Sequence, residues 1–207
     1  SSPVVTGLVA LIKQIYPKWT HDQIKSALMN TAEILINLVN GLPITFQLQG
    51  AGEARVDRAM VTPAFLKPRA LVVQKNIIQP DDQNPSSWLT CELSSNQNNS
   101  QTFSLSYKTY LLEGEYNPIQ IEFKQESVTV AGKNNSSFEY HFQIEWDKME
   151  RARYEGIIMV GSDLHIPFII YRDGVSKLPD SISDIRVNPT EVNFIQSSDL
   201  TPADNGI

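Results

Sequence analysis

The 207-residue sequence predicts an α+β fold divided by segment, in which a short helical segment precedes an antiparallel β-sandwich. Up to Thr31 the apolar residues recur at helical spacing, with helix-breaking and capping signals between two runs. From Ala70 onward apolar and polar residues alternate instead, as in half-buried strands. Pro63 and Pro68 frame the change from one pattern to the other.

The first predicted helix covers residues 4–15 and is apolar on nearly every side. Pro3 suits its first turn, where a backbone N–H has no intrahelical partner in any case. A helix that is apolar all round is typical of a protein interior. Gly7 costs roughly 1 kcal/mol of helix stability relative to Ala, which suggests that another backbone packs closely there. We therefore expect this helix to be buried.

A second helix is predicted over residues 21–31, after Pro17 ends the first. Thr20 followed three residues later by Gln23 is the capping-box pattern for its start. The second helix has apolar residues at helical spacing on its inner face, Ile24, Ala27 and Leu28.

Between the second helix and the sandwich the pattern leaves two structures open. Residues 34–39 could extend the helix, or residues 44–48 could form a strand, with a break at Gly41-Leu42-Pro43. A last short helix is expected over residues 56–61, and residues 63–69 are expected to be a linker.

The alternating part predicts seven or eight short strands separated by Gly, Pro, Asn and Ser turns. Alternation implies that one face of each sheet is buried and the other is wet. The expected strands cover residues 71–78, 88–93, 103–107, 119–123, 138–146, 156–160 and 164–171. Residues 174–207 are polar and read equally well as a tail or linker or as the start of a further β domain.

The helical segment resembles the C-terminal end of the peptidase domain in subtilisin-like serine peptidases. There a central helix follows the nucleophile, a Pro-Trp connection leads to a second helix that often ends near Asn-Thr-Ala, and a Gly-x-Gly followed by Val and Ala closes the domain. The residues in register with that pattern are Pro3, Gly7, Pro17, Trp19, Thr20, Asn30, Thr31, Ala32, Gly50, Gly52, Val56 and Ala59.

The same register implies that this chain lacks the catalytic residues. In the family the nucleophilic Ser stands four residues before the Pro that matches Pro3, which places it two positions upstream of Ser1. The catalytic Asp and His and the oxyanion Asn stand further upstream still. Val4 departs from the many members that have His after this Pro. We therefore expect no catalytic residue in this chain.

The second half resembles the fibronectin-III-like, immunoglobulin-like domain that follows the peptidase domain in large secreted and cell-surface subtilases. Three motifs carry this resemblance: Val128-Thr129-Val130-Ala131-Gly132, Tyr154-Glu155-Gly156 and Leu164-His165-Ile166-Pro167-Phe168. The expected organisation is an incomplete peptidase domain at 1–62, a linker at 63–69, a sandwich at 70–173, and a linker or new β domain at 174–207. The resemblance implies an extracellular or cell-surface location.

Composition excludes several classes of protein. The net charge is −6 and no cluster of Lys and Arg is present, so a nucleic-acid partner is not expected. No apolar run is long enough to span a membrane. Cys91 is the single cysteine, which excludes an internal disulfide. No cation adjoins it in sequence to lower the pKa of its thiol, so a buried thiol is expected and not a nucleophile.

The sequence gives little support for a catalytic base or for a metal site. Only three histidines could serve as a catalytic base, and we expect His21 at an exposed helix start and His141 and His165 at solvent-facing strand positions. Asp81, Asp82 and Asp163 do not form a calcium-loop pattern, so neither a metal nor a cofactor is expected.

The leading hypothesis is a non-catalytic C-terminal fragment of a secreted or cell-surface subtilisin-like serine endopeptidase, with the sandwich as an accessory or substrate-positioning domain. Its partners would be the remainder of the peptidase domain and protein substrates. The isolated chain would then self-associate through the helix at residues 4–15, because that helix would leave a large apolar surface exposed. The alternatives are an independent β-sandwich binding or adhesion module and an inactive homologue that regulates a true peptidase.

Overall fold

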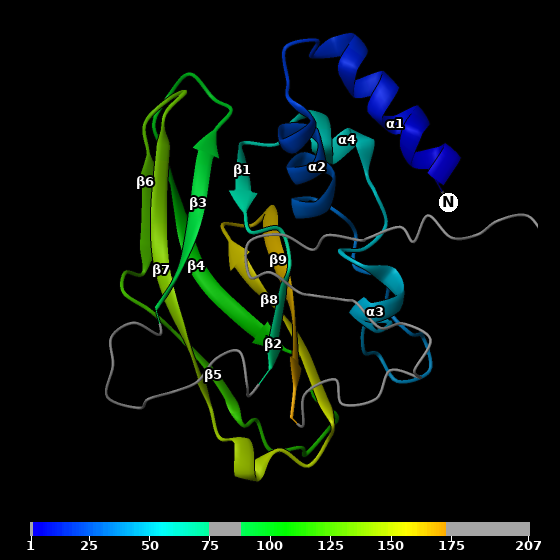
Figure 1. The fold of residues 1–207 in the computed structure, drawn as a ribbon, viewed down its shortest axis with the longest axis vertical. Helices are drawn as coiled ribbons and strands as arrows, with labels where there is room; N and C mark the ends of the chain where they lie inside the picture. The colour runs from blue at the N-terminus through cyan, green and yellow to red at the C-terminus, as the bar shows by residue number, and fades with distance from the viewer. Residues whose placement is uncertain (1, 75–87, 173–207) are drawn as a thin grey trace, which may run out of the picture.

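The computed structural model describes residues 2–74 and 88–172, which form a helical part packed against a two-sheet sandwich (Figure 1). The predicted division into a short helical segment and a β-sandwich is confirmed for this part of the chain. Ser1, Asp81, Asp82, the end of the strand predicted at 71–78, and residues 174–207 lie outside the described residues.

Three of the four helices of the described part begin close to the positions that the sequence predicts. The capping box at Thr20 is complete: its hydroxyl oxygen accepts a hydrogen bond from Gln23 N at 3.2 Å, and Gln23 Oε1 accepts one from Thr20 N at 2.8 Å. These bonds satisfy backbone donors that the first helical turn leaves free. The helices are α1 (Ser2–Ile15), α2 (His21–Asn30), α3 (Phe46–Gln49) and α4 (Val56–Met60).

The segment between α2 and α4 forms neither of the two structures that were expected there. A tight turn, closed by a bridge between Ile36 and Pro43, takes the place of a helix extension, and α3 takes the place of a strand. Thr45 starts α3 because its hydroxyl accepts a hydrogen bond from Gln47 N at 3.3 Å. Gly50 ends it with a φ of 62°, a conformation that glycine adopts without a steric penalty.

Two sheets enclose the main hydrophobic core, with strand orders β1-β3-β7-β5 and β2-β9-β8-β4-β6. The short 3₁₀-helix η2 (Trp146–Lys148) connects β7 to β8. The strands are β1 (Ala64–Lys67), β2 (Leu71–Gln74), β3 (Leu89–Ser95), β4 (Gln101–Thr109), β5 (Ile119–Phe123), β6 (Ser127–Val130), β7 (Asn135–Ile144), β8 (Arg153–Val160) and β9 (Leu164–Tyr171).

The sandwich is mixed, whereas the sequence predicted an antiparallel one. Strand β2 pairs with β9 in parallel, and the other described pairs are antiparallel. The chain passes from one sheet to the other between β1 and β2, so β2 arrives at the edge of the second sheet in the direction of β9. The alternation of apolar and polar residues within a strand does not predict which sheet the strand joins or in which direction it runs.

Strand β1 lies within residues 63–69, where the sequence predicted a linker. Ala64 and Leu66 contribute to the core between the sheets, whereas Phe65 contributes to the core of the helical part. The sequence does not reveal this strand because it has only four residues, too few to show a clear alternation, and because the prolines on either side indicate a loop. A strand with one face in each core couples the two parts of the molecule.

Strand β9 is buried on both faces, contrary to the expectation of one wet face. Leu164, Ile166, Phe168 and Ile170 point into the core between the sheets, while the alternate residues are covered by the helical part. The nearly continuous apolar run of β9 is the pattern of a strand covered on both sides. The helical part therefore forms a third layer over this sheet (Figure 1).

Helix α1 is the outermost element of the helical part and is mostly exposed (Figure 1). Among the residues of α1 whose burial the structure describes, only Ile12 is fully buried, while Val4 is 61% exposed and Ile15 is 56% exposed. A Cβ atom built at Gly7 meets no other atom within 4 Å, so the expected close backbone approach is absent in the described residues. Within this chain the helix therefore leaves much of its apolar surface uncovered. No helix of the described part is long and apolar enough to cross a membrane.

Candidate functional site at the junction of the helical part and the sandwich

The candidate site is the region where the helical part contacts strands β1, β8 and β9. We call this region the junction. Its apolar centre contains Phe46 from α3 packed on the outer-face residues Ile157 and Ile169. Trp19 extends the apolar contact to β1, because its ring lies edge-on to Phe65 at a centroid distance of 5.0 Å. Buried polar side chains surround this centre.

Asn30 joins α2 to both sheets. Its Nδ2 donates to the carbonyl oxygen of His165 in β9 at 3.3 Å, and its Oδ1 accepts from the backbone nitrogen of Leu66 in β1 at 3.0 Å. Asn30 is fully buried, so both bonds form away from water, where an unpaired amide is costly. The side chain therefore fixes the end of α2 relative to each sheet.

His165 lies at the same place and connects β9 to the turn that follows α3. Its Nε2 lies 3.2 Å from the carbonyl oxygen of Ala51, and the residue is only 8% exposed. A carbonyl only accepts, so Nε2 carries the proton and donates. Burial lowers the pKa of His165, and the positive charge of Arg58 adds to this, although the hydrogen bond to Ala51 acts in the opposite direction. The prediction that His165 faces solvent is wrong.

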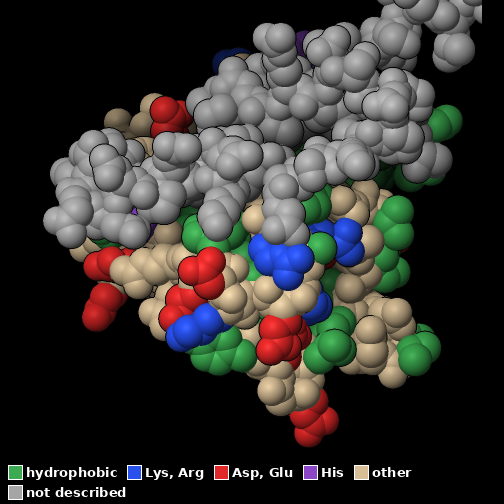
Figure 2. Space-filling view, turned by 60° about the horizontal axis from the view of Figure 1, so that its bottom comes forward, with side chains coloured by type: hydrophobic (Ala, Val, Ile, Leu, Met, Phe, Trp, Pro, Cys, Tyr) green, Lys and Arg blue, Asp and Glu red, His purple; other side chains and the backbone are tan. Residues whose placement is uncertain are grey.

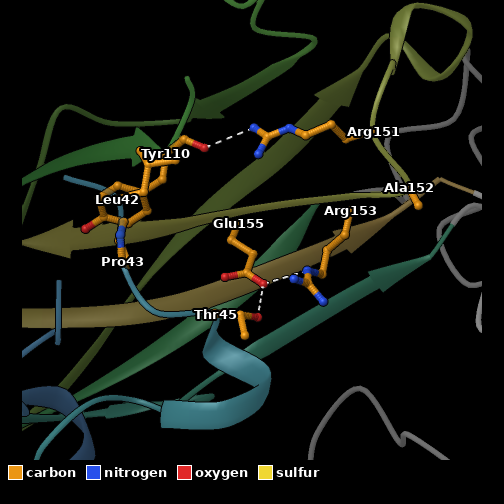
Figure 3. A pocket seen from close by; sticks show the side chains of 8 residues that line it. All are labelled: Leu42, Pro43, Thr45, Tyr110, Arg151, Ala152, Arg153 and Glu155. Atoms are coloured by element: carbon orange, nitrogen blue, oxygen red, sulfur yellow. Dashed lines mark hydrogen bonds and ion pairs between the residues drawn. The ribbon is translucent and has the colours of Figure 1, made fainter. Parts of the chain in front are cut away.

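Glu155 on β8 holds the start of α3 (Figure 3). Its Oε1 accepts from the Thr45 hydroxyl at 2.5 Å and pairs with Arg153 Nε at 2.8 Å, while its Oε2 accepts from Phe46 N at 2.9 Å. The Glu155 side chain is 12% exposed. A shielded carboxylate with three donors is a strong anchor, because its bonds are charge-assisted.

A third polar group joins α2 to the chain between β1 and β2. The Ser26 hydroxyl donates to Leu66 O at 3.2 Å and accepts from Arg69 Nε at 2.8 Å. Arg69 also forms an ion pair with Asp22 at 2.9 Å. The first and second turns of α2 are thus tied to this segment through Arg69.

The family-motif residues shape the helical part and its turns. Trp19 is buried and stacks on Tyr16 at a centroid distance of 4.2 Å, and Val56 begins α4 against the same core. Pro17 follows α1, and its carbonyl oxygen accepts from Lys13 Nζ at 3.2 Å. Pro3 and Gly7 lie on the exposed part of α1.

Gly52 has the clearest structural requirement among these motif residues. Its φ is 123°, and a Cβ atom there would lie 2.4 Å from the carbonyl oxygen of Glu33. The two backbones approach this closely because Glu33 and Glu53 exchange hydrogen bonds of 2.8 and 2.7 Å. Glycine at this position therefore allows the turn after α3 to reach β9 through Ala51.

The three histidines do not form a catalytic arrangement in the described residues. His21 is exposed at the start of α2, and His141 is half-buried with its ring 5.6 Å from the ring of Trp88. His165 donates to Ala51 O, and no described hydrogen bond joins a histidine to a serine or an aspartate. A serine-peptidase triad requires both of those contacts.

Two further candidates are the thiol of Cys91 and the carboxylate of Asp163. Cys91 is fully buried in β3, and burial raises the pKa of its thiol to about 12, so the thiol stays protonated near neutral pH. The expectation of a buried thiol is confirmed. Among the described residues no group of His, Cys, Asp and Glu could hold a metal ion, and Asp163 instead accepts a hydrogen bond from Ser162.

Acidic and basic side chains lie beside one another on the face shown in Figure 2. Exposed ion pairs of the described residues include Lys124 with Glu139 and Lys148 with Glu145. The Glu145 carboxyl has a lowered pKa because Lys148 donates a hydrogen bond to it, and the pKa of Lys148 is raised in turn.

Sequence reasoning did not identify Asn30, Glu155 or His165 as junction residues. For His165 a signal was present, since the run Leu164-His165-Ile166-Pro167-Phe168-Ile169-Ile170 is too apolar for a strand with one wet face. For Asn30 and Glu155 no local signal exists, because their partners are 36 and 109 residues away along the chain.

The helical part matches a known family. Residues 1–61 match the family model described as Peptidase S8, the subtilase family. Over 161 residues the chain is also 28% identical to the minor extracellular protease Vpr of Bacillus subtilis (strain 168), an alignment that covers 77% of this chain and 19% of that protein. The chain thus spans about a fifth of the length of this relative. Since 161 aligned residues exceed the 61 of the family match, the similarity to Vpr extends into the sandwich.

Solved structures resemble the chain only loosely. The FixG-related protein from Vibrio parahaemolyticus has a TM-score of 0.34 at 12% identity, over 53% of this chain and 94% of that chain. The CsuC–CsuE chaperone–tip adhesion subunit complex of Acinetobacter baumannii has a TM-score of 0.37 at 10% identity, over 56% of this chain and 59% of that chain. These low scores carry no argument about fold or function.

Proposed function

We propose that this chain is a non-catalytic C-terminal part of a subtilisin-like serine endopeptidase that acts outside the cell or at its surface. The observation that carries the proposal is a single alignment with an extracellular protease that runs from the helical part into the sandwich. The parent protein would cleave peptide bonds through an acyl-enzyme, with its nucleophile upstream of α1. The chain itself would supply structure to that enzyme.

The junction gives this structural role a physical basis. Asn30, Glu155 and His165 each bond across it, and Phe46 buries apolar surface against β8 and β9. A sandwich held in this way buttresses the last helices of a peptidase domain, and it is placed to orient large protein substrates. We assign it as the fibronectin-III-like accessory domain of the parent.

The exposed side of α1 fits the same proposal. Four large apolar residues on it are between 43% and 61% exposed: Val4, Val5, Leu11 and Ile15. Monomers rarely leave so much contiguous apolar helix surface in water. The remainder of the peptidase domain would cover this surface, while the isolated chain would bury it by self-association.

An assay for proteolysis tests the non-catalytic role. The full 207-residue chain is incubated with casein, with and without a serine-directed covalent inhibitor, beside an active serine peptidase as positive control. The proposal predicts no cleavage above the buffer blank. Cleavage that the inhibitor abolishes would show a working nucleophile in this chain and overturn the proposal.

The alternative of an independent binding or adhesion module is not favoured. Such a module would have no reason to align with a protease across both of its parts. It would also be expected to cover its own apolar helix, whereas α1 is largely exposed.

A further inference from the structure

The tight turn between α2 and α3 contains an asparagine that is followed by a glycine. Asn40 and Gly41 are both exposed. The sequence has one other Asn-Gly pair, Asn205-Gly206, which lies outside the described residues. Asparagine is a thermolabile residue, because its side-chain amide can react with the backbone nitrogen of the residue that follows it.

Gly41 presents that nitrogen without steric hindrance. Glycine has no side chain, and even a Cβ atom built at Gly41 meets no other atom within 4 Å. Its φ of 68° is a conformation that glycine adopts without penalty. The other asparagine of this turn, Asn37, is followed by Leu38, whose larger side chain hinders attack by its nitrogen. The turn therefore combines one asparagine with an accessible neighbouring nitrogen and one without.

The side-chain carbonyl of Asn40 is polarised by a backbone donor. Its Oδ1 accepts a hydrogen bond from Leu42 N at 3.0 Å. When a nucleophile adds to Cγ, negative charge develops on this oxygen, and a donor already in place stabilises that charge as in an oxyanion hole. The contact therefore favours attack on Asn40 Cγ.

The hydrogen bonds that close the turn oppose this reaction. Gly41 N donates to Asn37 O at 2.8 Å, and Asn37 N donates to Leu42 O at 2.7 Å. The Asn37 side chain adds a bond from Val39 N at 2.9 Å. Gly41 N must leave Asn37 O before it can attack, so the rate depends on how often the turn opens.

We propose that Asn40 is a site of slow, non-enzymatic modification in which its amide becomes an acid through a cyclic imide. Gly41 N forms a bond to Asn40 Cγ, the bond from Cγ to Nδ2 breaks, and the proton of Gly41 N leaves with the amide as ammonia. Water then adds to either carbonyl carbon of the ring. One opening gives aspartate, and the other gives isoaspartate, in which the main chain runs through the side chain.

Both products change the turn. Residues 34–52 contain no Asp, Glu, Lys or Arg, so either product brings the first charge into this segment. Isoaspartate also lengthens the main chain by one methylene group, which shifts Gly41 and Leu42 away from the partners that close the turn. The modification would thus loosen an exposed part of the chain as the protein ages, and it does not depend on the identity of the parent protein.

The test incubates the full chain for days in mildly alkaline buffer and analyses the tryptic peptide of residues 26–55 by mass spectrometry, against the same digest made before incubation. Fragmentation should place the conversion of amide to acid at Asn40 and leave Asn37 unchanged. In heavy-oxygen water the product should carry the label, with isoaspartate present beside aspartate. A linear peptide of residues 36–44 should convert severalfold faster, because its Gly41 nitrogen has no lasting bond to a carbonyl.

Three variants separate ring closure from the opening of the turn. Asn37→Ala removes the acceptor of Val39 N and should accelerate the conversion severalfold. Asn117→Ala removes the same kind of bond, from Ile119 N at 3.1 Å, in a loop of the sandwich and should leave the rate unchanged. Asn40→Gln should slow the loss of ammonia from this position at least about tenfold, because the longer side chain is less well placed for ring closure.

Several outcomes would overturn the proposal. An unchanged Asn40 after the linear peptide has converted would show that the folded turn prevents the reaction. Equal conversion of Asn37 and Asn40, or aspartate without isoaspartate, would indicate direct hydrolysis instead of ring closure. Equal loss of ammonia in Asn40→Gln and the wild type would exclude the cyclic imide in the same way.

Discussion

At the scale of single residues, the position of Gly52 requires both a positive φ and the absence of a Cβ atom, and only glycine meets both requirements. Its φ of 123° is unfavourable for L-residues, and a Cβ atom would lie 2.4 Å from Glu33 O. Gly7 belongs to the same sequence pattern but sits in a helix with nothing near its Cα hydrogens. The two glycines therefore make a matched pair for mutation.

Gly52→Ala should lower the free energy of unfolding by at least about 2 kcal/mol, because it adds backbone strain and a clash with Glu33. Gly7→Ala should raise it by up to about 1 kcal/mol, as expected for an exposed helix interior. Urea unfolding followed by circular dichroism measures both. A Gly52→Ala protein as stable as the wild type would show that the turn after α3 is placed wrongly.

His165 makes stability depend on pH. Burial lowers its pKa in the folded chain below the usual value of 6.5, so the unfolded chain binds a proton first as the pH falls. This contribution to stability is fully present above pH 6.5 and is lost as the pH falls from there toward the folded-state pKa. The charged group that faces His165 is Arg58.

The expected result is a free energy of unfolding that rises with pH in the range below 6.5 in the wild type. His165→Gln keeps a side-chain donor toward Ala51 and should flatten this dependence. Urea unfolding at a series of pH values measures the slope. An unchanged slope in His165→Gln would assign the pH dependence to another group.

At the scale of elements, α1 is the helix whose environment is incomplete. Leu11 is 50% exposed on this helix, and Leu112 is 51% exposed on a loop of the sandwich. Leu11→Asp should weaken self-association of the chain at least tenfold, since burying a leucine contributes about 1.5–3 kcal/mol. Leu112→Asp should not change it.

Size-exclusion chromatography with light scattering over a range of chain concentrations measures this association. A wild-type chain that stays monomeric while the amides of α1 are protected from hydrogen exchange would contradict the proposed exposure. It would also revive the alternative of an independent module.

The start of α2 could be predicted because its signals are local. The break at Pro17 and the capping box at Thr20 act within a few residues, and α2 begins where these signals place it. The placement of α1 could not be predicted in the same way. Its all-round apolarity indicates burial, but the sequence does not say whether this chain or another part of a protein covers it.

The sandwich could likewise be predicted only in part. The alternation of apolar and polar residues predicted most strands, but it did not predict β1, which lies between two prolines, or the parallel pairing of β2 with β9. The polar junction was missed because Glu155 and Asn30 act through partners distant in sequence. Residue type alone does not reveal which polar groups will be buried together.

At the scale of the whole molecule, the helical part and the sandwich are expected to unfold as one cooperative unit. Glu155 is the strongest single tie, because its removal leaves Thr45, Phe46 N and Arg153 without their acceptor. Glu155→Ala should cost about 2–4 kcal/mol of stability. Glu139→Ala, which removes an exposed ion pair with Lys124, should cost less than about 1 kcal/mol.

Native-state hydrogen exchange on the full chain tests this unity most directly, with amides in α2 compared to amides in β8 and β9. The account predicts the same opening free energy for both sets in the wild type. It also predicts that Glu155→Ala lowers both by the same amount. If Glu155→Ala releases the α2 amides while those of β8 and β9 keep their wild-type protection, the helical part and the sandwich are independent and the account is contradicted.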